Sequence, residues 1–335
     1  MKLLADWQLA GPLLTCWPYR NDVWRGNGEF VQQALLAMLH AILPYYPVTL
    51  AIHPPQLNIA LRQLPQQLTW LPLAYDDAWI RDFGPLFRSG PGGLSAVAGQ
   101  FDGWQGVHGV YQRDQRFAAA LAHRRALPLH SLPFIFEGGM LSHDGAGTAV
   151  VHACSLQRRN PQWRLAALER ELKRALGLQQ IIWLHQALSA DETGGHTDNQ
   201  LQFVDAHSIV YVTSTDDPAW NEEVATLQRQ PWGRAYRWIE LPAAQQVTDA
   251  VDIYHDVRRR AGVQRRGQRP LLCSYANLLR LPGALVVPQF GLADDSAAVA
   301  GLQQAFPELA VIPVDALEMV RGGGGPHCLS LVLPG

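Results

Sequence analysis

Short runs of β-branched and other apolar residues recur along the chain, separated by polar and turn-forming residues. Runs of about four to eight residues with this composition are typical of β-strands. The strand-like runs lie at residues 47–53, 132–136, 180–184, 208–213, 236–241, 270–275, 284–290 and 309–314.

Segments with a helical spacing of apolar residues lie between these runs, at residues 30–43, 160–177, 216–230 and 294–306. For the second of them we predict Asn160 as the N-cap, Pro161 as the first helical residue and Gly177 at the end. The alternation predicts an α/β protein. Because no linker and no change of composition interrupts it, we expect one domain, residues 1–335, built from repeated ββαβ-like units.

Composition narrows the class of protein. The 335 residues are 48% hydrophobic, which excludes wholesale disorder, and the formal net charge of -2 argues against nucleic-acid binding. The longest apolar segment, residues 34–43, is too short for a membrane helix, and no signal peptide is visible. The four cysteines are far apart, so neither a zinc ribbon nor a disulfide scaffold is expected, and we expect a cytoplasmic protein.

Two segments combine acidic residues with glycine. Residues 75–85 place Asp77 and Asp82 around Trp79, and residues 136–148 place Glu137 before two glycines. A solvated turn with local ion pairs would explain the first segment, and a surface turn would explain the second. The alternative is a set of carboxylates beside a cleft that binds a cation.

A third segment, residues 191–204, contains His196 and Asp198. If this segment is extended, the two side chains share one face with Gln200 and Gln202, since strand side chains alternate. Burying a face of polar and charged side chains costs free energy, so a functional role would explain it. An exposed strand face and half of a metal site are the other interpretations.

Near the C-terminus, a run of four glycines ending at Gly325 leads through Pro326 and His327 to Cys328 and an apolar strand. A thiolate at the end of a glycine-rich loop is a candidate nucleophile, although an inert buried cysteine fits as well. Asn277, in an apolar context, is by itself more typical of a structural asparagine.

These parts together suggest nucleophilic catalysis by a cysteine with histidine as the proton shuttle. The excess of acids, Asp82, Glu137 and Asp198, would hold a planar cation, and a guanidinium matches carboxylates in bidentate geometry.

The sequence resembles the agmatine deiminase and bacterial-type peptidylarginine deiminase family of guanidino-modifying enzymes. Six blocks occur in the family's order along nearly the whole chain: WPYRNDVWR, DDAWIRDFGP, EGGMLSHDGAGT, GGHTDN, SYANLLRLPGALVVPQFG and GGGGPHC. The resemblance implies a five-bladed, pseudo-symmetric α/β propeller with its site in the central channel.

The resemblance also implies the roles of individual residues. Cys328 matches the nucleophile and His196 the general acid and base. Asp82 and Asp198 match the pair that grips the guanidinium, and Glu137 matches a further acid near the histidine. Glu192 matches the residue associated with the distal amine of agmatine. We also expect substrate contacts from Asp77, Trp79, Trp104, Asn277 and Gly325.

The expected reaction converts agmatine and water to N-carbamoylputrescine and ammonia without a metal or organic cofactor. A peptidylarginine or free-arginine deiminase is the first alternative. The second is a metallohydrolase using His196, Asp198, His143 and Asp144, and the third is a catalytically silent guanidino-binding protein. The expected partner is a small guanidino molecule, with neither nucleic acid nor membrane, and a homodimer is allowed for.

Overall fold

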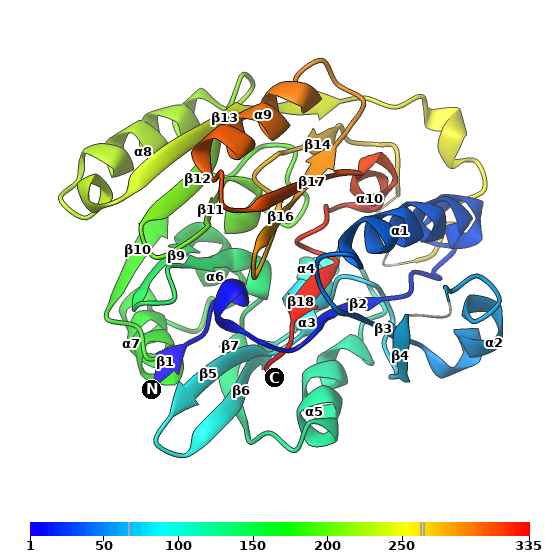
Figure 1. Cartoon of the computed structure of the whole chain (residues 1–335), viewed down its shortest axis with the longest axis horizontal. Helices are drawn as coiled ribbons and strands as arrows, with labels where there is room; N and C mark the ends of the chain where they lie inside the picture. Colours follow the sequence, from blue (N-terminus) through cyan, green and yellow to red (C-terminus); the bar gives the residue numbers. More distant parts are fainter. Residues whose placement is uncertain (66–67, 262, 264) are drawn as a thin grey trace.

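The computed structural model describes the whole chain except residues 66–67, 262 and 264. The described residues form five small sheets (Figure 1). The first has the order β1 (Lys2–Leu3), β5 (Leu86–Gly90), β6 (Gly93–Gln100), β7 (Leu129–Ile135). The second has the order β10 (Gln180–Leu184), β9 (Thr148–His152), β8 (Leu141–His143).

The remaining three sheets complete the set. The third has the order β11 (Leu201–Phe203), β12 (Ser208–Ser214), β13 (Arg237–Val247), β14 (Leu271–Cys273). The fourth has the order β15 (Leu279–Leu281), β16 (Ala284–Gln289), β17 (Ala310–Asp315). The fifth has the order β18 (Ser330–Val332), β2 (Leu13–Cys16), β3 (Val48–Ile52), β4 (Thr69–Pro72).

Each sheet contains an antiparallel pair of strands followed by a parallel pair. The antiparallel pairs are β5/β6, β8/β9, β11/β12, β15/β16 and β18/β2. The parallel pairs are β6/β7, β9/β10, β12/β13, β16/β17 and β2/β3. A parallel pair needs a crossover, and helices supply it, so the repeated ββαβ unit predicted from the sequence is present. The five sheets are compatible in number with the five expected blades.

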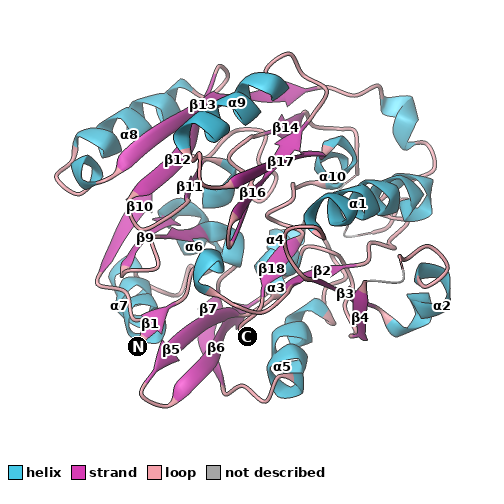
Figure 2. Ribbon diagram, viewed as in Figure 1, coloured by secondary structure: helices cyan, strands magenta, loops and turns pink. Residues whose placement is uncertain are grey.

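Helices connect the strands, and the longer ones lie toward the outside of the molecule (Figure 2). They are α1 (Glu29–Ile42), α2 (Leu57–Ala60), α3 (Ile80–Phe83), α4 (Gly103–Gly106), α5 (Asp114–Arg124), α6 (Ala153–Arg159), α7 (Leu165–Leu176), α8 (Pro218–Arg229), α9 (Asp295–Ala305) and α10 (Leu317–Gly322). Within the described part of the chain, no helix is both long enough and apolar enough to span a membrane.

The two ends of the chain meet in one sheet. Strand β18 pairs with β2, with Ser330 opposite Thr15, so the segment that follows Cys328 is fixed to the N-terminal part of the molecule. Ser330, Leu331 and Val332 are buried. The glycine-rich loop before Cys328 is therefore anchored on one side by a core strand, and α10 holds its other side.

Two local predictions are wrong. The helix predicted for residues 160–177 begins at Leu165, because the Asn160 side chain instead bonds the backbone of Ile135 and the carbonyl of Leu156. Its predicted end is confirmed, since Gly177 is a left-handed C-cap with φ 69°. Residues 196–202 are not one extended face, because Thr197–Asn199 forms a 3₁₀ turn before β11.

Candidate active site

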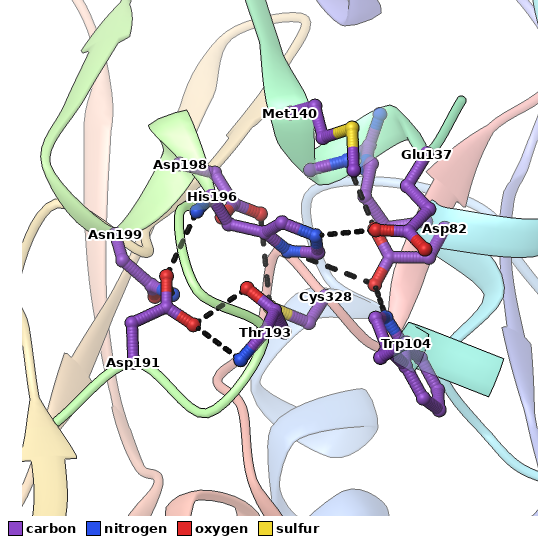
Figure 3. A network of polar contacts seen from close by, with 12 residues as sticks. Asp82, Trp104, Glu137, Met140, Asp191, Thr193, His196, Asp198, Asn199 and Cys328 are labelled. Carbon is purple, nitrogen blue, oxygen red and sulfur yellow. Dashed lines mark hydrogen bonds and ion pairs between the residues drawn. The ribbon is translucent and has the colours of Figure 1, made fainter. Parts of the chain in front are cut away.

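One cavity collects side chains from segments that are far apart in the sequence. It is lined by Trp79, Asp82, Trp104, Val107, His108, Glu192, Thr193, His196, Asn199, Gly323 and Cys328. Most of these residues lie on the short helices and loops that connect strands, which is where a rigid α/β scaffold places functional side chains. Figure 3 shows the polar network around His196 and Cys328.

His196 lies between two carboxylates. Its Nε2 is 2.9 Å from Oε2 of Glu137, and its Nδ1 is 3.7 Å from Oδ2 of Asp82 (Figure 3). The backbone N–H of His196 donates to Asp191 at 2.8 Å, which fixes the loop that carries it. Burial alone lowers the pKa of the imidazole, but Asp82 and Glu137 outweigh it and raise the pKa of His196 to about 10. The imidazole is therefore protonated at neutral pH.

Glu137 is held in its ionised form by a buried arginine. Arg159 forms an ion pair with Glu137, and its Nε donates to Asp102 at 3.0 Å. Burial favours the protonated carboxyl, but the Arg159 charge and the hydrogen bond from His196 leave the pKa of Glu137 below its usual value. Arg159 thus fixes the orientation of the Glu137 carboxylate, and Oε2 of that carboxylate faces the imidazole of His196.

Asp82 belongs to the short helix α3, and both of its oxygens accept hydrogen bonds. Oδ1 accepts from the N–H of Gly139 at 2.9 Å, and Oδ2 accepts from Nε1 of Trp104 at 2.8 Å. Only glycine fits at position 139, because a methyl group there would collide with Nδ1 of His196. Burial raises the pKa of Asp82 to about 6, with Glu137 and Asp198 adding to the effect against the His196 charge.

Cys328 is buried, and its thiol faces polar groups. Nδ2 of Asn277 lies 3.1 Å from the sulfur and also donates to Oδ1 of Asn199 at 3.0 Å. Oδ2 of Asp198 lies 3.6 Å from the sulfur. Burial, followed by the charges of Asp198 and Asp82, raises the pKa of the Cys328 thiol well above its usual value. These effects favour the protonated thiol over the thiolate.

His327 is a member of this site to which the sequence analysis gave no role. Its Nδ1 lies 2.7 Å from Oδ2 of Asp198, and both residues are buried. Although burial opposes it, this hydrogen bond lowers the pKa of Asp198, which stays ionised. The only signal in the sequence is that His327 precedes Cys328, and adjacency along a chain does not show which distant carboxylate a side chain meets.

One carboxylate oxygen of Asp198 is unpaired within the described part of the chain. Oδ1 is buried and has no hydrogen-bond partner among the residues that the structure describes. A buried, ionised oxygen without a donor is costly, so this atom is suited to receive an N–H from a bound cation. Asp82, which lines the cavity with Cys328, supplies a second carboxylate, while Asp198 lies against the Cys328 sulfur.

The structure separates the expected substrate contacts into two groups. Trp79, Trp104 and Glu192 line the cavity with Cys328, whereas Asn277 and Gly325 line an adjoining cavity. Among the described residues, Asp77 lines neither of these cavities. Its carboxylate accepts from Trp24 Nε1 at 3.2 Å and lies 3.1 Å from Nδ1 of His108, so Asp77 lies behind the cavity wall.

The residues of the metallohydrolase alternative serve other contacts. Asp144 accepts three backbone N–H groups of residues 146–148, and His143 Nδ1 accepts the N–H of Gly145. Asp198 is engaged by His327 instead. In the described part of the chain, no group of three or more histidine, cysteine or acidic residues is arranged to hold a metal.

Comparison with known proteins finds relatives that match nearly the whole chain. Agmatine deiminases of Pseudomonas fluorescens and Pseudomonas aeruginosa are each 32% identical to the chain, covering 98% and 99% of it and 94% and 95% of their own lengths. The solved agmatine deiminase of Enterococcus faecalis superposes with a TM-score of 0.93 at 26% identity, covering 99% of this chain and 95% of its own. Residues 2–334 match the Porphyromonas-type peptidyl-arginine deiminase family. The chain therefore belongs to the Porphyromonas-type peptidyl-arginine deiminase family.

Proposed function

We propose that this protein hydrolyses the guanidino group of agmatine, giving N-carbamoylputrescine and ammonia. The observation that carries the proposal is that Cys328, His196 and Asp82 line one cavity, with Asp198 against the thiol. A nucleophile, a protonated imidazole and two carboxylates are the groups needed to bind a planar cation and displace one of its nitrogens.

Asp82 and Asp198 bind the guanidinium in this proposal. Ionised carboxylates accept paired N–H groups from a guanidinium, and Oδ1 of Asp198 is available for that bond. The bound cation then offsets the negative charges that raise the pKa of the Cys328 thiol. Substrate binding thus favours loss of the thiol proton to solvent, and the thiolate faces the central carbon.

The first half of the reaction forms a covalent intermediate. The thiolate attacks the guanidinium carbon, and His196 gives its proton to the departing nitrogen, which leaves as ammonia. A thiouronium on Cys328 and a neutral imidazole remain. The pKa of His196, raised to about 10, means that the imidazole carries this proton before the reaction begins.

The second half restores the enzyme. His196 takes a proton from water as its oxygen bonds to the thiouronium carbon. The carbon–sulfur bond then breaks, the remaining hydroxyl proton returns to the thiolate, and the ureido product leaves. The proton first released by the thiol is taken up by ammonia, which becomes ammonium.

The choice of agmatine over other guanidino compounds is supported by the relatives, which are named agmatine deiminases, and by Glu192 in the cavity wall. A carboxylate there suits a distal ammonium, whereas free arginine also presents a carboxylate. Ammonia release from agmatine, free arginine and an arginyl peptide tests the proposal. The largest kcat/KM is expected for agmatine, and preference for either arginine substrate would establish the alternative.

We further propose that residues 1–335 form one catalytic domain, since β18 near the end of the chain completes a sheet with β2 near its start. A small guanidino molecule as the partner follows from the proposed reaction. A cytoplasmic location, a lack of nucleic-acid binding and a homodimer stay predictions from the sequence.

A further inference from the structure

A row of four polar side chains runs from behind the cavity wall to Glu192, which lines the cavity. Oδ2 of Asp77 lies 3.1 Å from Nδ1 of His108. Nε2 of His108 lies 3.1 Å from Nη2 of Arg266, and Nη1 of Arg266 lies 2.7 Å from Oε1 of Glu192. The segments that supply these residues are remote from one another in the sequence, and the row joins them beside the cavity that contains Cys328.

The proton positions in this row are determined by the arginine. A guanidinium can only donate, so Nε2 of His108 must accept and the ring proton must lie on Nδ1, the nitrogen that lies 3.1 Å from Oδ2 of Asp77. Burial lowers the pKa of His108 although Asp77 opposes the shift, which agrees with a neutral imidazole. Asp77 and His108 thus hold one side of Arg266, while Glu192 receives the other side.

Glu192 lies where two cavities meet. It lines the cavity of Cys328 and His196, and it also lines the adjoining cavity together with Arg265, Arg266 and Arg269. The side chains of Arg266 and Glu192 are only 7% and 16% exposed, so their contact is largely shielded from water. Gly323, with φ +118°, makes room for it, because a methyl group there would collide with Oε1 of Glu192.

We propose that Arg266 is a specificity-determining residue that competes with the distal ammonium of the substrate for Glu192. This inference rests on the proposed function. The guanidinium of Arg266 already occupies the position beside the carboxylate that a cationic tail needs. A largely buried carboxylate must keep a cationic partner. An incoming ammonium therefore has to replace Arg266 or share the Glu192 carboxylate with it. The affinity for a cationic tail is therefore set by how firmly His108 and Asp77 hold Arg266.

Two substrates that differ only at the distal end test the inference. Agmatine carries an ammonium after four methylene groups, and N-pentylguanidine carries a methyl group at the same place. In Arg266→Gln, the ratio of kcat/KM for agmatine to that for N-pentylguanidine should rise about tenfold, the scale of a close and shielded charge pair. Arg260→Gln is the matched control, because Arg260 lies in the same segment, is 55% exposed and contacts Asp22 instead. Its ratio should equal that of the unaltered protein.

A Glu192→Gln variant tests whether the rise in the kcat/KM ratio depends on the Glu192 carboxylate. In Glu192→Gln, adding Arg266→Gln should produce no rise in the ratio, because the shared carboxylate is gone. If Arg266→Gln does not fold, Arg266→Lys keeps the charge but cannot reach both Glu192 and His108 with a planar fork, and a smaller rise is expected.

Three results would overturn the inference. One is an unchanged or lower ratio in Arg266→Gln. Another is a rise that persists without Glu192. The third is that Arg266→Gln selectively loses turnover of 4-guanidinobutyrate, a substrate whose distal end is a carboxylate. That loss would show that Arg266 binds a substrate carboxylate. If the unaltered protein releases ammonia from none of these compounds, the proposed function itself fails and the inference falls with it.

Discussion

Nδ1 of His327 lies 2.7 Å from Oδ2 of Asp198, so the residue that precedes the candidate nucleophile orients a carboxylate proposed to bind the substrate. The contact leaves Oδ1 of Asp198 available and stabilises its charge. We therefore regard His327 as a positioning residue, one that acts through Asp198 and does not itself touch the substrate.

The contact predicts different effects for two substitutions. His327→Ala removes the donor and should lower kcat/KM by about tenfold or more, the cost of leaving a buried charged group unsatisfied. His327→Asn places an amide N–H near the position of Nδ1 and should recover most of the loss. Steady-state kinetics on both variants check this. Equal losses in both would show that His327 fills space only.

Two predictions concern Asp82: a loss of activity when it is substituted, and a decrease of kcat/KM at low pH. Asp82→Asn removes one of the two carboxylates proposed to grip the guanidinium and should lower kcat/KM roughly a hundredfold. Because the pKa of Asp82 is raised to about 6, protonation should weaken substrate capture as the pH falls through that value.

The pH profile of kcat/KM for the unaltered protein checks this limit. An acid limb near pH 6 is expected, and the Asn variant should lack it. Full activity in Asp82→Asn would remove Asp82 from the proposed mechanism.

Glu137 is expected to influence the decrease of kcat/KM at high pH. The pKa of His196 is raised to about 10 because Asp82 and Glu137 favour the charged imidazole. In Glu137→Gln one of these charges is lost, so the pKa of His196 should fall. The general acid would then lose its proton at a lower pH, and the alkaline limb of kcat/KM should move toward neutrality. A limb that stays in place would mean that another group is responsible for it.

Much of the fold could be predicted because it depends on local pattern. All the strand-like runs coincide with strands, since short apolar and β-branched runs bounded by turn-forming residues favour strands. The start of α7 could not be predicted, because Asn160 is a good N-cap by composition and only the tertiary structure shows its amide bonded to β7. The 3₁₀ turn at Thr197–Asn199 likewise has tertiary contacts that a local pattern does not show, since the N–H of His196 donates to Asp191 and the Thr197 hydroxyl donates to the carbonyl of Met140.

The site divides in the same way. The blocks that carry Cys328, His196 and Asp82 are recognisable in the sequence, and the structure brings these three residues to one cavity. The sequence did not indicate roles for His327 and Arg266, because their function depends on partners 129 and 74 positions away along the chain. Asp77 was expected to contact the substrate because it lies close to Asp82 in the sequence. Its carboxylate instead lies next to His108, and sequence spacing does not show this direction.

The most direct test of the account is the covalent role of Cys328. Cys328→Ala should fold, with a circular dichroism spectrum and melting temperature close to those of the unaltered protein, and should release no ammonia from agmatine. The unaltered protein, quenched in acid during turnover, should show an added mass equal to agmatine minus ammonia on the peptide that contains Cys328. Full ammonia release by Cys328→Ala, or turnover without that adduct on any quench time scale, would contradict covalent catalysis at this residue.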